Sequence, residues 1–188
     1  MAERISFSAT INGQAVGPLD IPADLMLTEL LHEYLNLTGT RAACGQGVCR
    51  ACTVIFDDAA GGARTLPACV TGAAWANGRT LRTIEGIAGR DPEGRVVPSA
   101  IQQAYLDHFS FQCSFCTPGF VMAATALVEE LGRAPIPRAQ LEDRIVAALN
   151  ENICRCTGYI RYLEAVRAVI LASPGLVIDV VATDARQG

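Results

Sequence analysis

Cysteine is the residue type that this sequence arranges for chemistry. Cys44, Cys49 and Cys52 follow the spacing C-x4-C-x2-C, and Cys69 follows later in the chain. Two irons bridged by two sulfides need four thiolates, two for each iron, so a short loop can hold one side of such a cluster while a distant cysteine completes the other. The spacing therefore predicts a [2Fe–2S] cluster in the first half of the chain.

The loop between these cysteines contains Gly45 and Gly47. Glycine tolerates a positive φ and lets backbone N–H groups approach a ligand closely. We expect these N–H groups to donate hydrogen bonds to the cluster sulfurs and so to help set the reduction potential.

A second set of thiols lies in the other half of the chain, as the pairs Cys113/Cys116 and Cys154/Cys156. Each pair precedes a predicted helix, where the helix dipole and unpaired N–H groups favour thiolates and a negatively charged cluster. The spacing favours a second [2Fe–2S] cluster. It leaves one tetrahedral zinc ion with four thiolate ligands as the alternative.

Composition and charge limit the classes of protein that this sequence can encode. The 188 residues are 51% hydrophobic, which is enough for a core, and the net charge of −4 argues against nucleic acid as a partner. No apolar run approaches the roughly 18 residues of a membrane span, so we expect none. The N-terminus lacks a basic region followed by an apolar one, so we expect a cytoplasmic protein whose thiols stay reduced and bind metal rather than form disulfides.

The first half begins with a predicted β-hairpin. Residues 5–11 alternate apolar and polar, which indicates a half-buried strand, and Asn12-Gly13 is a strong turn signal. A second strand is expected over residues 15–21, where Pro18 favours a sheet edge.

A helix and three further strands are expected before the first half ends. Asp24 is the expected N-cap of the helix, and strands are expected over residues 53–56, 64–70 and 80–84. The apolar face of the helix is Leu27, Leu30, Leu31, Tyr34 and Leu35. A strand ribbon, a helix and then the cysteine loop together indicate a β-grasp.

The second half is predicted to be helical. Ser99 is the expected cap of its first helix, Thr117 caps the second with Pro118 at the first helical position, and Gly132 ends it. The apolar faces of the four helices are Ile101, Tyr105 and Phe109; Phe120, Val121, Ala124, Leu127, Val128 and Leu131; Leu141, Ile145, Val146 and Leu149; and Ile160, Leu163, Val166, Val169 and Ile170.

These patterns predict an α+β chain with two domains. Residues 1–84 form a plant-type ferredoxin-like β-grasp domain, and residues 99–174 form an all-α four-helix bundle. Residues 85–98 break every periodicity and are rich in glycine and proline, which indicates a linker. Residues 175–188 are a C-terminal tail that begins with the short apolar run 176–181.

With both thiol sets in view, the chain resembles the iron–sulfur small subunit of the xanthine oxidase or molybdenum hydroxylase family. That family includes aldehyde oxidoreductases, carbon monoxide dehydrogenases and isoquinoline-type oxidoreductases. The resemblance covers about residues 4–172 and rests on the segments 44–54, 83–86, 112–119 and 154–159.

The resemblance implies an electron-transfer subunit of an oxidoreductase. A large partner subunit would bind the molybdopterin cofactor, and a medium subunit with FAD, or a cytochrome, would accept the electrons. Two [2Fe–2S] clusters would link them. The cluster distant from molybdenum would be held by Cys44, Cys49, Cys52 and Cys69, and the near one by Cys113, Cys116, Cys154 and Cys156.

The resemblance also implies two contacts with the molybdenum cofactor. Gln112 matches the glutamine that contacts the pterin in this family, and Cys156 matches the cysteine whose sulfur is linked to the pterin by a hydrogen bond. This chain departs from the family motif at Arg50 and Ser114, which occupy positions where glycine usually stands.

Two other functions stay open at this stage. The chain could be a free-standing electron carrier with two clusters, although a plant-type ferredoxin needs only the first half. Alternatively, the helical half could be a zinc-dependent interaction module. The substrate of the whole enzyme is not readable here, because the substrate pocket lies in another chain.

Overall fold

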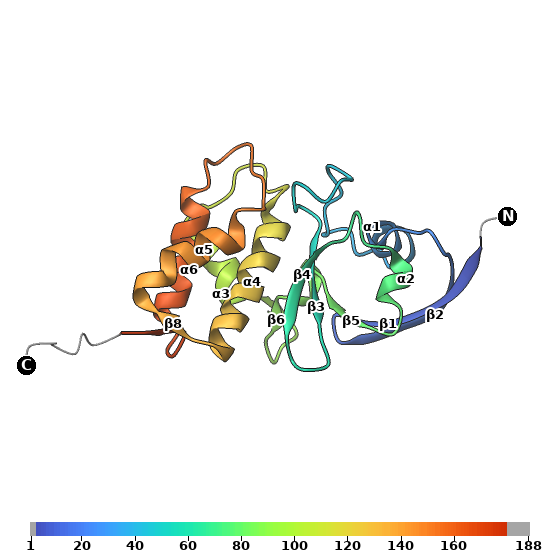
Figure 1. The fold of residues 1–188 in the computed structure, drawn as a ribbon, viewed down its shortest axis with the longest axis horizontal. Helices are drawn as coiled ribbons and strands as arrows, with labels where there is room; N and C mark the ends of the chain where they lie inside the picture. Colours follow the sequence, from blue (N-terminus) through green and yellow to red (C-terminus); the bar gives the residue numbers. More distant parts are fainter. Residues whose placement is uncertain (1–2, 180–188) are drawn as a thin grey trace, which may run out of the picture.

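A mixed β-sheet and a group of helices lie side by side in the computed structural model, which describes residues 3–179 (Figure 1). The sheet strands are β1 (Arg4–Ile11), β2 (Gln14–Pro22), β3 (Thr53–Asp57), β4 (Ala63–Pro67) and β5 (Thr80–Arg82). Their order is β2-β1-β5-β3-β4, with β1 parallel to β5 and the other pairs antiparallel. The predicted α+β class is confirmed.

The first hairpin forms as its sequence predicts. Asn12 and Gly13 have φ angles of 53° and 76°, the left-handed pair that a tight two-residue turn requires. Pro18 lies in β2, an edge strand of the sheet, where its missing N–H is tolerated.

Two short helices cover this sheet. They are α1 (Leu27–Glu29), which continues as a π-helical turn (Leu30–Tyr34), and α2 (Ala73–Ala76), which the sequence patterns did not indicate. The buried side chains between them and the sheet include Phe7, Ile21, Leu27, Leu30, Val54 and Leu81.

Three details of the first half differ from expectation. Asp24 is not the N-cap of α1; that position is Met26, and the carboxylate of Glu29 accepts its backbone N–H at 2.9 Å. Tyr34 is exposed because the π-helical turn rotates the predicted apolar face. The fourth and fifth strands are shorter than predicted: β4 ends at Pro67, and β5 gives way to a 3-10 turn (Ile84–Gly86).

Four longer helices build the second half: α3 (Ala100–Asp107), α4 (Thr117–Arg133), α5 (Leu141–Leu149) and α6 (Ile160–Ala172). They enclose one core that includes Tyr105, Phe120, Leu127, Leu131, Ile145, Tyr162, Val166 and Ile170. Ser99 caps α3 as predicted, in a reciprocal capping box with Gln102.

Some helix details were predicted wrongly. The N-cap of α4 is Cys116, and Thr117 is its first residue, because the Thr117 hydroxyl bonds instead to the hydroxyl of Tyr162 at 2.8 Å. The helix also continues through Gly132 to Arg133. Three residues expected on apolar faces are exposed: Phe109, Val146 and Ile160. Phe109 lies beyond the end of α3, with a φ of 49°.

The predicted linker and tail have some regular structure of their own. Residues 85–98 contain a small antiparallel ribbon, β6 (Gly89–Arg90) with β7 (Val96–Val97). In the predicted tail, β9 (Val177–Ile178) pairs in parallel with β8 (Ile136–Pro137), beside a short 3-10 turn (Arg138–Gln140). The rest of the predicted tail, from residue 180, lies outside the described residues. The domain boundaries stay a prediction.

The two halves are joined by charge and by close packing. The guanidinium of Arg82 in β5 binds Asp57 in β3 and Glu129 in α4, with a pair of hydrogen bonds to each carboxylate. Near the start of α4, a Cβ on Gly119 would lie 2.2 Å from the carbonyl oxygen of Arg50. Within residues 3–179, no helix has both the length and the apolar character that crossing a membrane requires.

Gly119 and Gly132 lie in the same helix and provide a matched test of this packing. Gly119→Ala should lower the stability of the protein by about 1–3 kcal/mol, because overpacking against backbone cannot be relieved by a rotamer change. Gly132→Ala should leave stability unchanged or raise it by up to about 1 kcal/mol, because the nearest side-chain atom to its added Cβ is 3.8 Å away and alanine favours a helix. Thermal unfolding of the two variants checks the difference, and equal stabilities would contradict the close approach at Gly119.

Candidate metal centres

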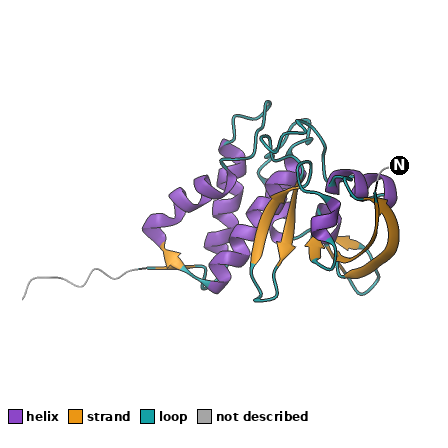
Figure 2. Ribbon diagram, turned by 45° about the vertical axis from the view of Figure 1, so that its right-hand side comes forward, coloured by secondary structure: helices purple, strands orange, loops and turns teal. Residues whose placement is uncertain are grey.

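The cysteines lie in loops that gather along one edge of the molecule. One loop leaves the π-helical turn and enters β3, and two others precede α4 and α6 (Figure 1). Cys69 lies in a fourth loop, between β4 and α2. Figure 2 shows the same grouping of loop segments from a second direction. The fold therefore brings both thiol sets to the same side of the chain.

Within the first set, the four thiols lie as two pairs. The Cys49 side chain contributes to the pKa shift of the Cys44 thiol, and the Cys69 side chain to that of the Cys52 thiol. The backbone N–H of Gln46 donates to Sγ of Cys44 and that of Gly47 to Sγ of Cys69, both at 3.4 Å. Gly45 and Gly47 have φ angles of 65° and 71°, as the expected role of these glycines requires.

The two pairs of the first set differ in electrostatics. Backbone N–H groups of Cys49 and Gln46 lower the pKa of the Cys44 thiol to about 6. Burial raises the pKa of the Cys52 thiol to about 12. A thiol with so high a pKa ionises only when a cation compensates the buried charge, as a metal ligand does.

The second set is also divided into two pairs. Sγ of Cys113 lies 3.6 Å from Sγ of Cys156, and both residues are exposed. The thiols of Cys116 and Cys154 contact each other, and both residues are buried. Each pair thus joins one cysteine that precedes α4 with one that precedes α6.

Burial and hydrogen bonds act in opposite directions on the buried pair. Burial raises the pKa of the Cys116 thiol to about 12. Burial also opposes ionisation of Cys154, but hydrogen bonds from the Thr157 hydroxyl, at 3.1 Å, and from backbone N–H groups outweigh it and lower the pKa of that thiol. This pair is therefore suited to ligands of a charged centre rather than to free thiols.

The paired arrangement fits a cluster of two irons. Such a cluster takes two thiolates at each iron, and each set offers two pairs. A single zinc ion would need four thiols around one point.

Direct hydrogen bonds connect the two cysteine loops. The backbone N–H of Ile153, beside Cys154, donates to the carbonyl oxygen of Cys49 at 3.1 Å. Next to it, the side-chain amide of Asn152 donates to the carbonyl oxygen of Arg50 at 3.2 Å. The two loops are thus held in a defined relation to each other.

Arg50 and Ser114, the two departures from the family motif, both have left-handed backbones. Their φ angles are 57° and 60°, a region that glycine adopts at no steric cost. The Arg50 side chain is mostly buried and forms an ion pair with Glu151 at 2.5 Å. This pair adds a third link between the two loops.

Several residues around the thiols were not singled out as site residues from the sequence. Thr157 and Tyr162 contact the buried cysteine pair of the second set, and Asn152 and Ile153 bind the first loop. For Thr157, the sequence offers one indication: it lies in segment 154–159, on which the family resemblance partly rests. Asn152 and Ile153 carry no local signal, because their partners are distant in sequence.

Gln112 is accessible at the surface, as its predicted contact with a pterin requires. It is exposed and adjacent to Cys113, at the edge that also holds Cys156. Its contact with a pterin stays a prediction.

Family models identify both halves of the chain. A model described as "2Fe-2S iron-sulfur cluster binding domain" matches residues 10–74, and one described as "[2Fe-2S] binding domain" matches residues 83–167. The two matched regions contain the two thiol sets. The fold and the site thus define an iron–sulfur protein with two [2Fe–2S] clusters, and the zinc alternative is wrong.

Comparison with whole proteins identifies the family. The chain is 36% identical to the nicotine 6-hydroxylase small subunit of Paenarthrobacter nicotinovorans, over 93% of this chain and 92% of that one. It is 37% identical to the xanthine dehydrogenase iron-sulfur-binding subunit of Escherichia coli O157:H7, over 84% and 89% of the two chains. A chain of quinoline 2-oxidoreductase from Pseudomonas putida 86 superposes with a TM-score of 0.73 at 30% identity, over 93% of this chain and 94% of that one.

The chain belongs to the family of iron–sulfur small subunits of xanthine oxidase-type molybdenum hydroxylases. The resemblance stated from the cysteine motifs is confirmed.

The Arg50–Glu151 pair predicts a change in reduction potential. Arg50→Gly or Arg50→Gln should lower the potential of the N-terminal cluster on the order of tens of millivolts, because the lost cation stabilised the reduced state and Glu151 is left unpaired. Unit charges near a protein surface interact by about 1–4 kcal/mol, and about 1.4 kcal/mol corresponds to roughly 59 mV for a one-electron couple. Redox titration followed by EPR measures the shift. Arg4→Gln, which removes an ion-paired arginine from the sheet edge, is the matched control; an unchanged or raised potential in the Arg50 variants would contradict the prediction.

Proposed function

We propose that each thiol set ligates one [2Fe–2S] cluster. Cys44, Cys49, Cys52 and Cys69 hold the first, and Cys113, Cys116, Cys154 and Cys156 hold the second. The observation that carries this assignment is the division of each set into two contacting pairs, one pair for each iron. Each cluster, when bound, accepts and passes on one electron at a time.

We propose that the chain is the electron-transfer subunit of a cytoplasmic molybdenum hydroxylase. Its partners are a large subunit that binds the molybdopterin cofactor and an electron acceptor, either an FAD subunit or a cytochrome. The helices α3, α4, α5 and α6 act as a four-helix bundle that presents the second thiol set at one end. Two family-model matches and near full-length similarity to separate small subunits support this proposal.

The exposed pair of the second set is the entry point for electrons. Cys113 and Cys156 reach the surface next to Gln112, so this edge faces the molybdenum cofactor of the partner. An amide at Gln112 can both donate to and accept from a polar pterin. The buried pair lies behind it, one residue from the hydrogen bond between Ile153 and Cys49 that leads to the first set.

Exposed apolar side chains favour a subunit over a free carrier. Phe109 and Ile160 are 74% and 65% exposed, and their neighbours in sequence, Ser110 and Arg161, bond to each other. Phe115, between two cysteines of the second set, is also exposed. Apolar groups clustered around a functional centre are typical of a protein interface.

The purified complex should contain two [2Fe–2S] clusters for each copy of this chain. Low-temperature EPR of the reduced protein should resolve two signals that integrate to one spin each, since each cluster accepts one electron. Gel filtration of the native extract should place the chain in a large complex. A single spin for each chain would contradict the two-cluster assignment, whereas elution of the chain alone with both clusters would favour the free carrier.

Gln112→Ala should slow electron entry without preventing cluster assembly. The change removes the proposed contact with the pterin but no thiol. Rapid-reaction measurements of the reduction of the second cluster by substrate give the rate, and EPR reports whether the cluster is intact. Gln103→Ala, an exposed glutamine on α3 that bonds only to Asp107 among the described residues, is the control. A wild-type rate with an unaltered EPR signal would show that Gln112 does not make this contact.

A further inference from the structure

The segment Thr83–Gly86 carries no thiol, yet it lies at the junction of three parts of the fold. It follows β5 and forms the 3-10 turn that leads into the helical half. Its residues contact the β1–β2 turn, the segment that runs into the first cysteine loop, and the core of the helical half.

The carboxylate of Glu85 binds the backbone that leads into the first cysteine loop. Its Oε1 accepts the backbone N–H of Gly39 at 2.8 Å, and its Oε2 accepts the hydroxyl of Thr83. Gly39 lies in the irregular segment 36–43, which connects the π-helical turn to Cys44. A carboxylate is a strong acceptor, so this bond fixes one point of a segment without regular backbone pairing.

Thr83 ties Glu85 to the sheet. It is fully buried, and its hydroxyl oxygen accepts from the side-chain amide of Asn12 at 2.9 Å while it donates to Glu85. The backbone N–H of Thr83 also donates to the Asn12 side-chain oxygen at 2.8 Å. The carboxylate of Glu85, an exposed residue, is therefore held on the sheet side by part-buried hydrogen bonds that converge on the buried Thr83.

Two glycines show how closely these parts fit. A Cβ on Gly39 would lie 2.3 Å from the Ile84 side chain and 2.8 Å from Oε1 of Glu85. A Cβ on Gly86 would lie 2.3 Å from the side-chain oxygen of Asn12. Both glycine backbones therefore lie directly against side chains, Gly39 against Ile84 and Glu85, and Gly86 against Asn12.

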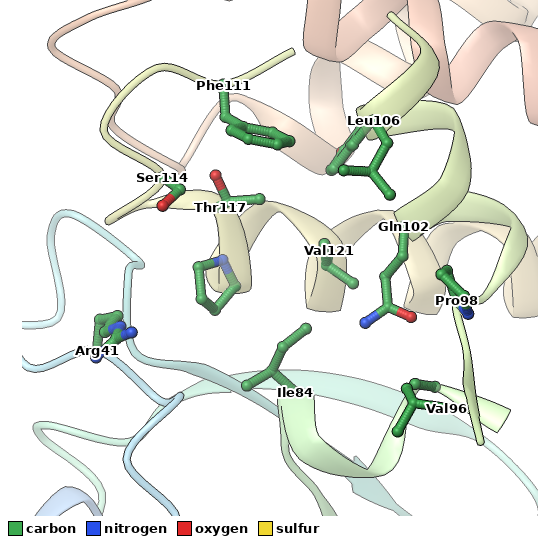
Figure 3. Close-up of a pocket in the computed structure, with 13 residues that line it drawn as sticks. Arg41, Ile84, Val96, Pro98, Gln102, Leu106, Phe111, Ser114, Thr117 and Val121 are labelled. Atoms are coloured by element: carbon green, nitrogen blue, oxygen red, sulfur yellow. The ribbon is translucent and has the colours of Figure 1, made fainter. Parts of the chain in front are cut away.

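The same segment reaches the second thiol set through Ile84. This side chain lines a pocket of about 350 Å³ together with Arg41, Ser114 and Val121 (Figure 3). Arg41 lies two residues after Gly39 in the segment 36–43. Its guanidinium is 5.9 Å from the ring centre of Phe115, a residue that stands between Cys113 and Cys116 in the sequence. A shift of segment 36–43 would therefore alter the conformation of both cysteine loops, most directly at Cys44.

We propose that Glu85 is a positioning residue for the first cluster. By holding the N–H of Gly39, and being held by Thr83 and Asn12, it fixes the direction in which segment 36–43 enters the loop that begins at Cys44. The proposal rests on the proposed function, in which that loop ligates a [2Fe–2S] cluster. The contact determines the environment of the first cluster directly and affects that of the second less.

The test compares three variants in the assembled complex. Glu85→Ala removes the acceptor and the charge. Glu85→Gln removes the charge but keeps an oxygen that can accept from Gly39. Thr83→Val removes the hydroxyl that joins Glu85 to Asn12, while the charge of Glu85 and the backbone bond to Asn12 stay. Glu93→Ala removes an exposed carboxylate from the linker ribbon, where it bonds to Arg95, and is the matched control.

Two measurements report positioning rather than activity. Hydrogen exchange followed by mass spectrometry gives the opening of segment 36–43, and redox-poised EPR gives the line shape and potential of each cluster. Glu85→Ala and Thr83→Val should speed exchange of the segment by about tenfold, since each loses at least one charge-assisted hydrogen bond of the Glu85 carboxylate, and should broaden the first EPR signal. Glu85→Gln should have a smaller effect. The second signal should change less than the first, and Glu93→Ala should change neither signal nor the exchange of the segment.

Two outcomes would overturn the proposal. If exchange and the first signal stay as in the wild type in both Glu85→Ala and Thr83→Val, the contact does not position the loop. If Glu85→Ala and Glu85→Gln shift the potential equally and Thr83→Val does not, Glu85 acts only through its charge. Should Glu85→Ala fail to assemble, exchange in Thr83→Val and Glu85→Gln decides. A failure of the proposed function would instead be seen in the wild type, as the absence of two cluster signals.

Discussion

The contact between the start of α4 and the first cysteine loop is the constraint on which the arrangement of the two centres depends. Gly119 lies against the carbonyl group of Arg50, and that same carbonyl accepts the side-chain amide of Asn152. Only a residue without a side chain permits this approach. Because Cys116 lies at the N-terminus of α4 and Cys49 precedes Arg50, the contact holds the two thiol sets in a fixed relation. Fixed separation matters for a protein that passes electrons between two centres, since a flexible joint would make the route variable.

The loops that carry the thiols are held by tertiary contacts more than by their own conformational preference. Arg50, Ser114 and Tyr159 all have positive φ angles, which cost L-residues about 1–2 kcal/mol each. Their surroundings offset this cost. Arg50 pairs with Glu151, and the Tyr159 hydroxyl accepts the backbone N–H of Cys154 at 3.1 Å. A glycine at position 50 would relax the backbone but would lose the ion pair between the loops, which is the physical difference between this chain and the usual family motif.

Local sequence patterns predicted the elements whose stability is local. The Asn12-Gly13 hairpin, the helix cap at Ser99 and the buried stripe of α4 all formed as expected, because each depends on neighbours within a few residues. The wrong predictions arose where residues distant in sequence compete with local neighbours for a side chain. Thr117 does not cap α4, since its hydroxyl is taken by Tyr162, and the predicted apolar face of α6 omitted Tyr162, which stacks on Phe120 with ring centres 4.1 Å apart. Periodicity alone also placed Phe109 and Ile160 in the core, although both lie at helix ends where the apolar neighbours stop.

The sequence by itself determined the kind of the first centre, the number of thiols available for each centre, and the family, because ligand type and spacing along a short loop are local properties. For the second centre the spacing favoured a [2Fe–2S] cluster but left zinc open. The tertiary structure decided which thiols pair, which pair reaches the surface and which is buried. It also decided that Ile153 meets Cys49, that Glu151 meets Arg50, and that Glu85 meets Gly39. These contacts join residues that lie far apart in the chain, and their positions depend on how the helices pack against the sheet. Spacing along a chain can specify which atoms bind a metal, but only packing can specify what surrounds them.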